Sequence, residues 1–245
     1  MPERKVVVVM PAYNAARTLR DTHQRIPSFV REVILVDDHS QDETAAVATA
    51  LGLKVIRHPH NVGYGGNQKT CYLEALQRGA DVVVMLHPDG QYEPSLIPRM
   101  VEPIVRGEAD MVLGSRLAVP GAWRRSGMPR YKFVANHVLT TLENLAMGTS
   151  FAELHTGYRA YSADFLRAIP FLRNSNDFVF DTQVIAQAVA FGQRIVEVPA
   201  RSRYFSDASS VGFAVGTRYG LKTLWVMARF VAWRIGLARS AMFRR

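Results

Sequence analysis

The chain has 245 residues, 48% of them hydrophobic and 21% charged, a balance that is typical of one globular domain and excludes fibrous and disordered chains. The formal net charge of +9 favours partners that carry phosphate, such as nucleic acid, anionic lipid or phosphorylated ligands. The single cysteine, Cys71, excludes an intramolecular disulfide framework and indicates a reducing compartment.

Apolar runs and helical patterns alternate through the first half of the chain. Runs rich in Val, Ile and Leu predict buried strands at 5–10, 33–36, 53–56, 83–86 and 110–114. Helical patterns separate them, which predicts an α/β fold with a mostly parallel sheet flanked by helices. Right-handed crossovers would then bring Pro11, Asp37 and His87, which follow three of these strands, to one edge of the sheet.

The pattern changes after Arg116. We expect a loop at 120–130, a helix at about 131–147, a strand within 155–161, a helix starting at 177–181, a strand at 193–199 and a helical tail from 211. This order predicts two units. Residues 1–205 would form the main α/β domain, and residues 206–245 a basic, amphipathic helical tail.

Three polar side chains, His87, Asp89 and Gln91, follow the fourth strand. In an extended chain they point to one side, at the end of the sheet where open α/β folds bind ligands. Imidazole, carboxylate and amide oxygen suit a divalent ion such as Mn²⁺ or Mg²⁺. The alternative is a simple turn, because Pro88 and Gly90 favour turns and aspartate often bonds its own backbone.

Two further clusters are candidates for ligand binding. Asp37 and Asp38 can accept hydrogen bonds from a nucleobase or ribose, or else Asp38, Ser40 or Asp42 caps the next helix. Gly63 belongs to a glycine-rich loop that can approach a phosphate at a helix N-terminus. That loop is neither a Walker loop nor a dinucleotide fingerprint, and its glycines are equally well explained by backbone turns.

Six short segments occur in order and at suitable spacing: VMPAYN (9–14), VDDHSQD (36–42), NVGYG (61–65), DGQ (89–91), GSR (114–116) and TGYR (156–159). Over about residues 5–205, the chain resembles family 2 of the inverting nucleotide-sugar glycosyltransferases. Within that family it is most similar to the dolichyl- and polyprenyl-phosphate mannosyl- and glucosyltransferases. The resemblance implies a GT-A fold, a UDP- or GDP-sugar donor and a divalent cation, Mn²⁺ or Mg²⁺.

The resemblance also implies roles for individual residues. The base and ribose would be held by Pro11, Ala12, Tyr13 and Asp37, to which we add the neighbouring Asn14, Asp38 and Gly63. Asp89 would bind the metal, with Gln91 beside it, and Arg116 would contact the donor diphosphate or the reacting phosphate. The alternative for Arg116 is a surface ion pair.

Two positions depart from the family pattern. His87 stands where an aspartate is usual, and Ala15 where glutamate is common. A histidine ligand would favour Mn²⁺ over Mg²⁺, whereas the alternative is a histidine that only caps the strand end. His155 is a second candidate near the site.

The acceptor decides which other residues are needed. A hydroxyl acceptor needs a general base, for which Asp181 is the candidate, so Asp89, Arg116 and Asp181 form the predicted catalytic set. A phosphate acceptor is already an anion and needs a cationic site instead. The candidates for that site are Arg130, Lys132, Arg201 and Arg203, with Arg124 and Arg125 also available. The alternative for each is a solvated surface charge.

The tail at 221–234 is apolar but interrupted by charge, so it cannot supply a membrane span. Trp and Phe beside Arg suit a helix lying on an anionic membrane surface, and Arg218, Lys222 and Arg229 would share one face. The alternative is a helix packed on the catalytic domain with its arginines outward.

These patterns together predict a cytoplasmic glycosyltransferase, peripheral on the cytoplasmic face of the membrane, that glycosylates a polyprenyl phosphate. One alternative is transfer to a soluble or polysaccharide hydroxyl, and another is a nucleotide-sugar-binding module without activity, motivated by the missing first aspartate. We expect no nucleic-acid partner, because the basic residues cluster in an apolar tail and no recognition motif is present.

Overall fold

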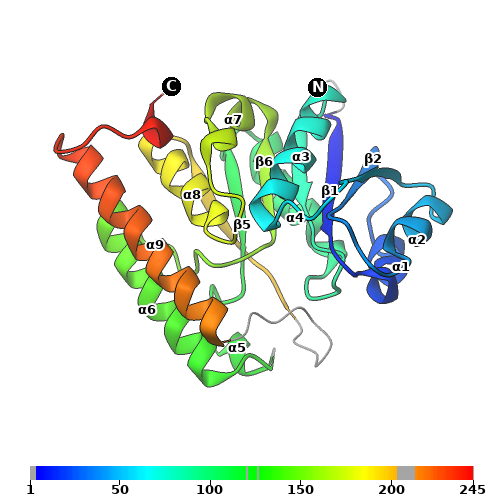
Figure 1. Ribbon diagram of the computed structural model, residues 1–245, viewed down its shortest axis with the longest axis horizontal. Coiled ribbons are helices and arrows are strands. Elements are labelled where there is room, and N and C mark those ends of the chain that lie inside the picture. The colour runs from blue at the N-terminus through cyan, green and yellow to red at the C-terminus, as the bar shows by residue number, and fades with distance from the viewer. Residues whose placement is uncertain (1–3, 120, 126, 203–212, 245) are drawn as a thin grey trace.

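A central sheet with helices on both faces forms the body of the protein (Figure 1). The computed structural model describes residues 4–119, 121–125, 127–202 and 213–244. The strands are β1 Val6–Ala12, β2 Glu32–Asp37, β3 Lys54–Arg57, β4 Val82–Met85, β5 Met111–Ser115, β6 Arg159–Ser162 and β7 Ile195–Pro199. Their order is β3-β2-β1-β4-β6-β5-β7. Only β6 runs antiparallel to its neighbours, so the predicted mostly parallel α/β sheet is confirmed.

The helices cover the two faces of the sheet according to the alternation of the strand side chains. They are α1 Ala16–Gln24, α2 Thr44–Ala50, α3 Tyr64–Gln77, α4 Ile97–Val105, α5 Ala122–Arg125, α6 Arg130–Met147, α7 Ala163–Ala168, α8 Phe180–Ala190 and α9 Phe213–Arg234, with short 3₁₀ turns at Pro94–Leu96, Phe171–Arg173 and Ala241–Phe243. In β1, Val7 and Val9 join the core under α3, α7 and α8, whereas Val8 and Met10 join the core under α1, α2 and α4.

The carboxyl ends of β1, β2 and β4 meet at one edge of the sheet, because these three strands are parallel. Ala12 at the end of β1 is in register with Asp37 at the end of β2, and Val9 with Met85 at the end of β4. The segments that follow these strands therefore lie side by side, as the sequence predicts, and they carry most of the candidate site residues.

Of the three residues that the sequence offers as a cap of α2, Asp42 bonds the start of the helix. Helix α2 begins at Thr44 with Glu43 in the N-cap position, Glu43 makes no side-chain cap, and the N–H of Thr44 donates to Asp42 Oδ1 at 3.1 Å. Ser40 Oγ instead accepts a hydrogen bond from the backbone N–H of Asn14, at 2.9 Å, and Asp42 Oδ2 accepts one from Ala16, at 3.1 Å. The segment after β2 thus secures the start of α1, because α1 has no capping side chain of its own.

Three other boundaries shift for local reasons. The expected loop at 120–130 contains the short helix α5. Strand β6 begins only at Arg159, because residues 156–157 form other hydrogen bonds than those of the sheet. Thr156 Oγ1 donates to Gly114 O, and the N–H of Gly157 donates to the Tyr92 hydroxyl. Helix α8 begins at Phe180, after a turn in which Asp177 Oδ1 accepts from the N–H of Val179.

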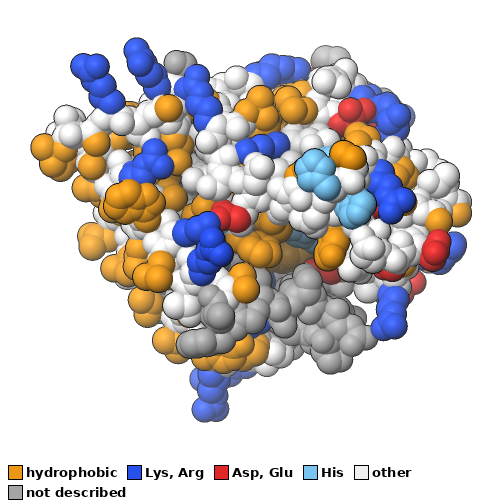
Figure 2. All heavy atoms as spheres, viewed as in Figure 1, with side chains coloured by type: hydrophobic (Ala, Val, Ile, Leu, Met, Phe, Trp, Pro, Cys, Tyr) orange, Lys and Arg blue, Asp and Glu red, His pale blue; other side chains and the backbone are white. Residues whose placement is uncertain are grey.

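Helices α6 and α9 run side by side in the same direction at one end of the molecule (Figure 1). Leu139 of α6 lies against Gly220 of α9, and further along Arg234 donates a hydrogen bond to Met147 O. Hydrophobic side chains gather on the outside of this pair (Figure 2). Among the described residues, no helix has the length and apolar character needed to cross a bilayer. The domain boundary predicted at 205/206 falls within residues 203–212, outside the described part of the chain.

Candidate active site

The predicted nucleotide residues gather where β1 and β2 end. Pro11 and Ala12 are buried at the end of β1, and the Tyr13 side chain that follows is 54% exposed. Asp37 is fully buried, and its Oδ1 accepts from the N–H of Ser40 at 3.1 Å. Its Oδ2 lies 3.3 Å from Arg57 Nε but forms no hydrogen bond within the described residues. Asp37 Oδ2 is thus buried against the Arg57 guanidinium, and contact between Asp37 and a nucleotide stays a prediction.

Three other residues of the predicted nucleotide site have structural roles. Asn14 adopts a positive φ of 52°, and its Oδ1 accepts from the N–H of Gln41. Asp38 accepts hydrogen bonds from the N–H groups of Val62 and Gly63 and pairs with the His58 ring. Gly63 has a φ of 89°, and a Cβ there would lie 2.6 Å from Asn176 O. Backbone geometry therefore explains this glycine, and its contact with a nucleotide stays a prediction.

The imidazole of His87 is packed between Tyr64 and the backbone of Gly157. The two rings stack with centroids 5.5 Å apart, and a Cβ on Gly157 would lie 3.0 Å from His87 Cδ2. His87 Nε2 is 3.3 Å from the Tyr64 hydroxyl, which donates its own proton to Asp181. Burial lowers the pKa of His87. Nε2 faces Tyr64, so metal binding by His87 stays a prediction.

Asp89 and Gln91 lie in a turn at the same strand end. Asp89 Oδ1 accepts from the N–H of Gln91 at 3.0 Å, as the turn interpretation expects, while the Gln91 side chain lines a cavity. The described residues contain no cluster of three His, Cys, Asp or Glu side chains that could hold a metal by themselves. The donor set nevertheless fits Mg²⁺ or Mn²⁺, because such ions are often bound through one carboxylate and the phosphates of a substrate.

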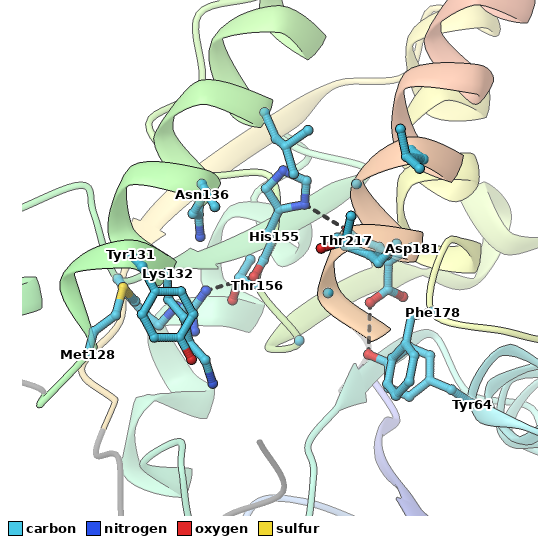
Figure 3. A pocket seen from close by; sticks show the side chains of 18 of the residues that line it. Tyr64, Met128, Tyr131, Lys132, Asn136, His155, Thr156, Phe178, Asp181 and Thr217 are labelled. Atoms are coloured by element: carbon cyan, nitrogen blue, oxygen red, sulfur yellow. Dashed lines mark hydrogen bonds between the residues drawn. The ribbon is translucent and has the colours of Figure 1, made fainter. Parts of the chain in front are cut away.

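A cavity of about 550 Å³ opens between the strand ends and the helices α6 and α9 (Figure 3). Its polar part includes Gln91, Arg116, Lys132, His155 and Asp181, and its apolar part includes Leu139, Leu221 and Leu224. The structure therefore brings together four residues that the sequence selected for the metal, the phosphate and the acceptor: Gln91, Arg116, Lys132 and Asp181. Arg130 and Arg201 are exposed and do not line this cavity, and Arg203 lies outside the described residues.

Arg116 is held in the cavity wall by Glu153, which the sequence analysis missed. The backbone N–H and Nε of Arg116 donate to Glu153 at 2.6 and 2.8 Å, and Nη2 donates to His155 O at 2.7 Å. Burial alone would raise the pKa of Glu153, but the Arg116 guanidinium keeps it below its usual range. The surface-pair alternative for Arg116 is therefore wrong, because both partners are buried. The one sequence-level argument that could have indicated Glu153 is that a buried arginine needs a carboxylate nearby.

Asp181 is the centre of a second buried group. Its Oδ2 accepts from the Tyr64 hydroxyl at 2.8 Å, and its Oδ1 accepts from Gln68 Nε2 at 3.1 Å and lies 2.6 Å from Arg159 Nη1. Arg159 is fully buried. It belongs to the TGYR segment, yet its role was not foreseen. Two hydrogen bonds and one ion pair therefore fix the position of the Asp181 carboxylate.

A third group joins α6 and α9 to the cavity. His155 Nε2 lies 2.8 Å from Glu143 Oε2 of α6, and His155 Nδ1 lies 2.7 Å from the Tyr219 hydroxyl of α9. Burial raises the pKa of Tyr219, so its hydroxyl remains protonated. His155 is therefore near the site, as predicted, and both of its ring nitrogens are engaged by the two helices.

The comparison with protein families identifies the family of the chain. Residues 7–169 match the family model described as glycosyl transferase family 2. The chain belongs to glycosyl transferase family 2. It is 31% identical to an undecaprenyl-phosphate mannosyltransferase of Micrococcus luteus, over 90% of this chain and 96% of that protein. It is 26% identical to a UDP-N-acetylglucosamine–dolichyl-phosphate N-acetylglucosaminyltransferase of Methanococcus voltae, over 88% and 93%.

Solved structures share the fold. Glucosyl-3-phosphoglycerate synthase from Mycobacterium tuberculosis, in complex with UDP, superposes with a TM-score of 0.70 at 18% identity, over 97% of this chain and 82% of that one. The same enzyme with Mn²⁺, UDP and phosphoglyceric acid gives a TM-score of 0.64 at 21% identity, over 97% and 80%. The predicted GT-A architecture is thus confirmed.

Proposed function

We propose that this glycosyltransferase moves a sugar from a nucleotide-sugar donor to a polyprenyl phosphate and inverts the anomeric carbon. The relatives named above act on undecaprenyl and dolichyl phosphates, which supports this acceptor class. The observation that carries the proposal is the shape of the cavity. It joins Arg116 and Lys132 at one end to leucine side chains at the other, which suits a phosphate with an apolar chain.

The acceptor phosphate would lie against Arg116 and Lys132. An oxygen of this phosphate attacks the anomeric carbon, the bond from that carbon to the donor diphosphate breaks, and the nucleoside diphosphate leaves. Because a phosphate monoester is already an anion near neutral pH, its second pKa being about 6, this step needs no general base. Asp181 would then orient the reacting groups, in keeping with its contacts to Tyr64 and Arg159.

The donor would lie at the ends of β1 and β2. Asp37 offers its buried Oδ2 to the base or ribose, and Tyr13 offers an exposed ring beside it. UDP and GDP donors both fit these contacts. Asp89, with Gln91 next to it, would hold a Mn²⁺ or Mg²⁺ ion that neutralises charge on the departing diphosphate. The Mn²⁺ in the solved relative supports a divalent cation.

We further propose that the protein is peripheral on the cytoplasmic face of an anionic membrane. Helix α9 packs inward through Val226, Met227 and Phe230, yet it also leaves Leu221 and Trp225 about two-thirds exposed. Helix α6 adds exposed apolar side chains to the same surface, namely Tyr131, Val134, Val138, Leu142 and Leu145. An apolar surface of this extent suits insertion into a leaflet. The single, buried Cys71 fits a reducing compartment.

The test is transfer by the purified full chain in liposomes that contain a polyprenyl phosphate. A panel of UDP- and GDP-sugars with Mn²⁺ or Mg²⁺ would be screened for release of nucleoside diphosphate and for a glycosylated lipid. We expect one donor to give a lipid product that mild acid cleaves, as it does a glycosyl phosphate. An acid-stable product would instead support a hydroxyl acceptor. Donor binding without any transfer would support a binding module.

A further inference from the structure

A second hollow follows the candidate cavity along the seam between α6 and α9. It is a groove of about 470 Å³ whose lining is entirely apolar: Leu142, Ala146, Leu224, Met227, Ala228, Val231, Ala232, Ile235 and Leu237. Leu224 lines both the cavity and the groove, so its side chain stands where one passes into the other.

The cavity and the groove form one path because the two helices run in the same direction. On α6 the lining passes from Lys132 through Leu139 to Leu142 and Ala146. On α9 it passes from Gly216 through Leu224 to Ala232. The groove stretch of α9, from Leu224 to Ala232, spans about 12 Å at 1.5 Å per residue. The path is therefore cationic at the end near Arg116 and apolar over the rest of its length.

We propose that this groove binds the isoprenoid units of a polyprenyl phosphate that lie nearest its phosphate. The inference rests on the proposed function and adds to it the place where the chain leaves the active site. The groove borders the exposed apolar surface of α6 and α9, so the remainder of the isoprenoid chain can continue into a leaflet. The enzyme then extracts only the first units of its acceptor, and the leaflet retains the rest.

The chemistry of the lining favours a lipid chain over a second copy of the protein. Interfaces between protein copies carry polar groups that form hydrogen bonds around an apolar centre, and none of the side chains lining this groove is polar. The groove also continues into a cavity that contains Arg116 and Lys132. This cationic end of the path suits an anionic head group, which a lipid phosphate has, and so favours a lipid over a second copy of the protein.

The test compares two acceptors that share a phosphate and differ in chain length, undecaprenyl phosphate and geranyl phosphate. The measured quantity is the ratio of kcat/KM for the long acceptor to kcat/KM for the short one. Ala228→Phe places a ring in the groove and should lower this ratio about tenfold, which corresponds to about 1.4 kcal/mol, or roughly two buried methylene groups. Thr141→Phe is the matched control, since Thr141 is exposed on α6 and lines neither hollow.

A second groove variant keeps the proposal testable if Ala228→Phe does not fold. Leu142→Ser removes apolar surface from the groove at a side chain that is 42% exposed, and it should lower the ratio in the same direction. An unchanged ratio in both groove variants, or an equal fall in Thr141→Phe, overturns the inference. A wild-type dimer in sedimentation velocity that Ala228→Phe converts to a monomer overturns it in favour of a contact between copies.

The two proposals fail in different ways. If the wild-type protein transfers sugar to both lipids with equal efficiency, the polyprenyl-phosphate activity stands and the groove has no role in it. If it transfers sugar to neither lipid but does glycosylate a soluble hydroxyl acceptor, the proposed function is wrong, and the groove proposal falls with it.

Discussion

Replacing Asp181 by Asn separates a positioning carboxylate from a general base. The substitution keeps the shape of the side chain but leaves the fully buried Arg159 without its counter-charge. Loss of one partner from a buried ion pair costs about 3–5 kcal/mol of unfolding free energy. At roughly 2–4 °C per kcal/mol for a protein of this size, the melting temperature should fall by about 6–20 °C.

Asp177→Asn is a matched control for this loss of stability. Asp177 makes an ion pair with Lys222 at the surface, where both side chains are more than a third exposed, so its loss should cost less than about 1 kcal/mol. The double variant Asp181→Asn with Arg159→Met removes the stranded charge and should regain part of the stability. Differential scanning calorimetry measures all three. Equal losses in Asp181→Asn and Asp177→Asn would refute the buried-pair reasoning.

Kinetics of the same variant, measured well below its melting temperature, test the role in transfer. If the acceptor is a phosphate, the pH profile of kcat should keep its acidic limb in Asp181→Asn, because no proton is transferred to this carboxylate. If Asp181 is a general base, the variant should lose about 10²–10⁴-fold in kcat and the acidic limb as well. The second outcome would contradict the polyprenyl-phosphate mechanism.

Four shorter predictions concern the metal, the acid limit and the membrane surface. Asp89→Asn should abolish transfer, as should EDTA with the wild type, and full activity in either assay would exclude Asp89 as the metal ligand. His87→Asp should keep activity and shift the preference toward Mg²⁺, whereas an unchanged preference in metal titrations would leave the imidazole only a packing role. Glu153 has a lowered pKa in the folded state, so its ionised side chain stabilises the fold above about pH 4.3, and this stabilisation is lost as the pH falls through the lowered pKa. Glu153→Gln should therefore be less stable than wild type near neutral pH. Melting curves should show that this difference in stability shrinks in acid. The double change Leu221→Asp and Trp225→Asp should weaken sedimentation with anionic liposomes about tenfold or more. Leu172→Asp, at an exposed leucine on a 3₁₀ turn away from α6 and α9, should not weaken it.

The sequence predicts what depends on neighbours along the chain. Apolar runs such as 6–10 and 82–85 form strands because both faces of a parallel sheet are buried, and the polar residues after them reach one edge because the strands are parallel. The hydrogen bonds between loops are harder to predict from the sequence. Whether Ser40 caps its own helix or secures α1 depends on how two loops meet, which no local pattern contains.

What the sequence leaves out are the partners of its buried charges. Arg116 and Asp181 can be selected from their motifs, but Glu153 and Arg159 hold them from segments distant in sequence. Such pairing requires the three-dimensional position of β6 and of the segment before it. The same holds for the apolar surface: α9 alone suggests an interfacial helix, whereas the groove and the broad exposed face exist only because α6 lies parallel beside it. The acceptor path is therefore a property of the packed pair, and variants in α6 should alter acceptor use as strongly as variants in α9.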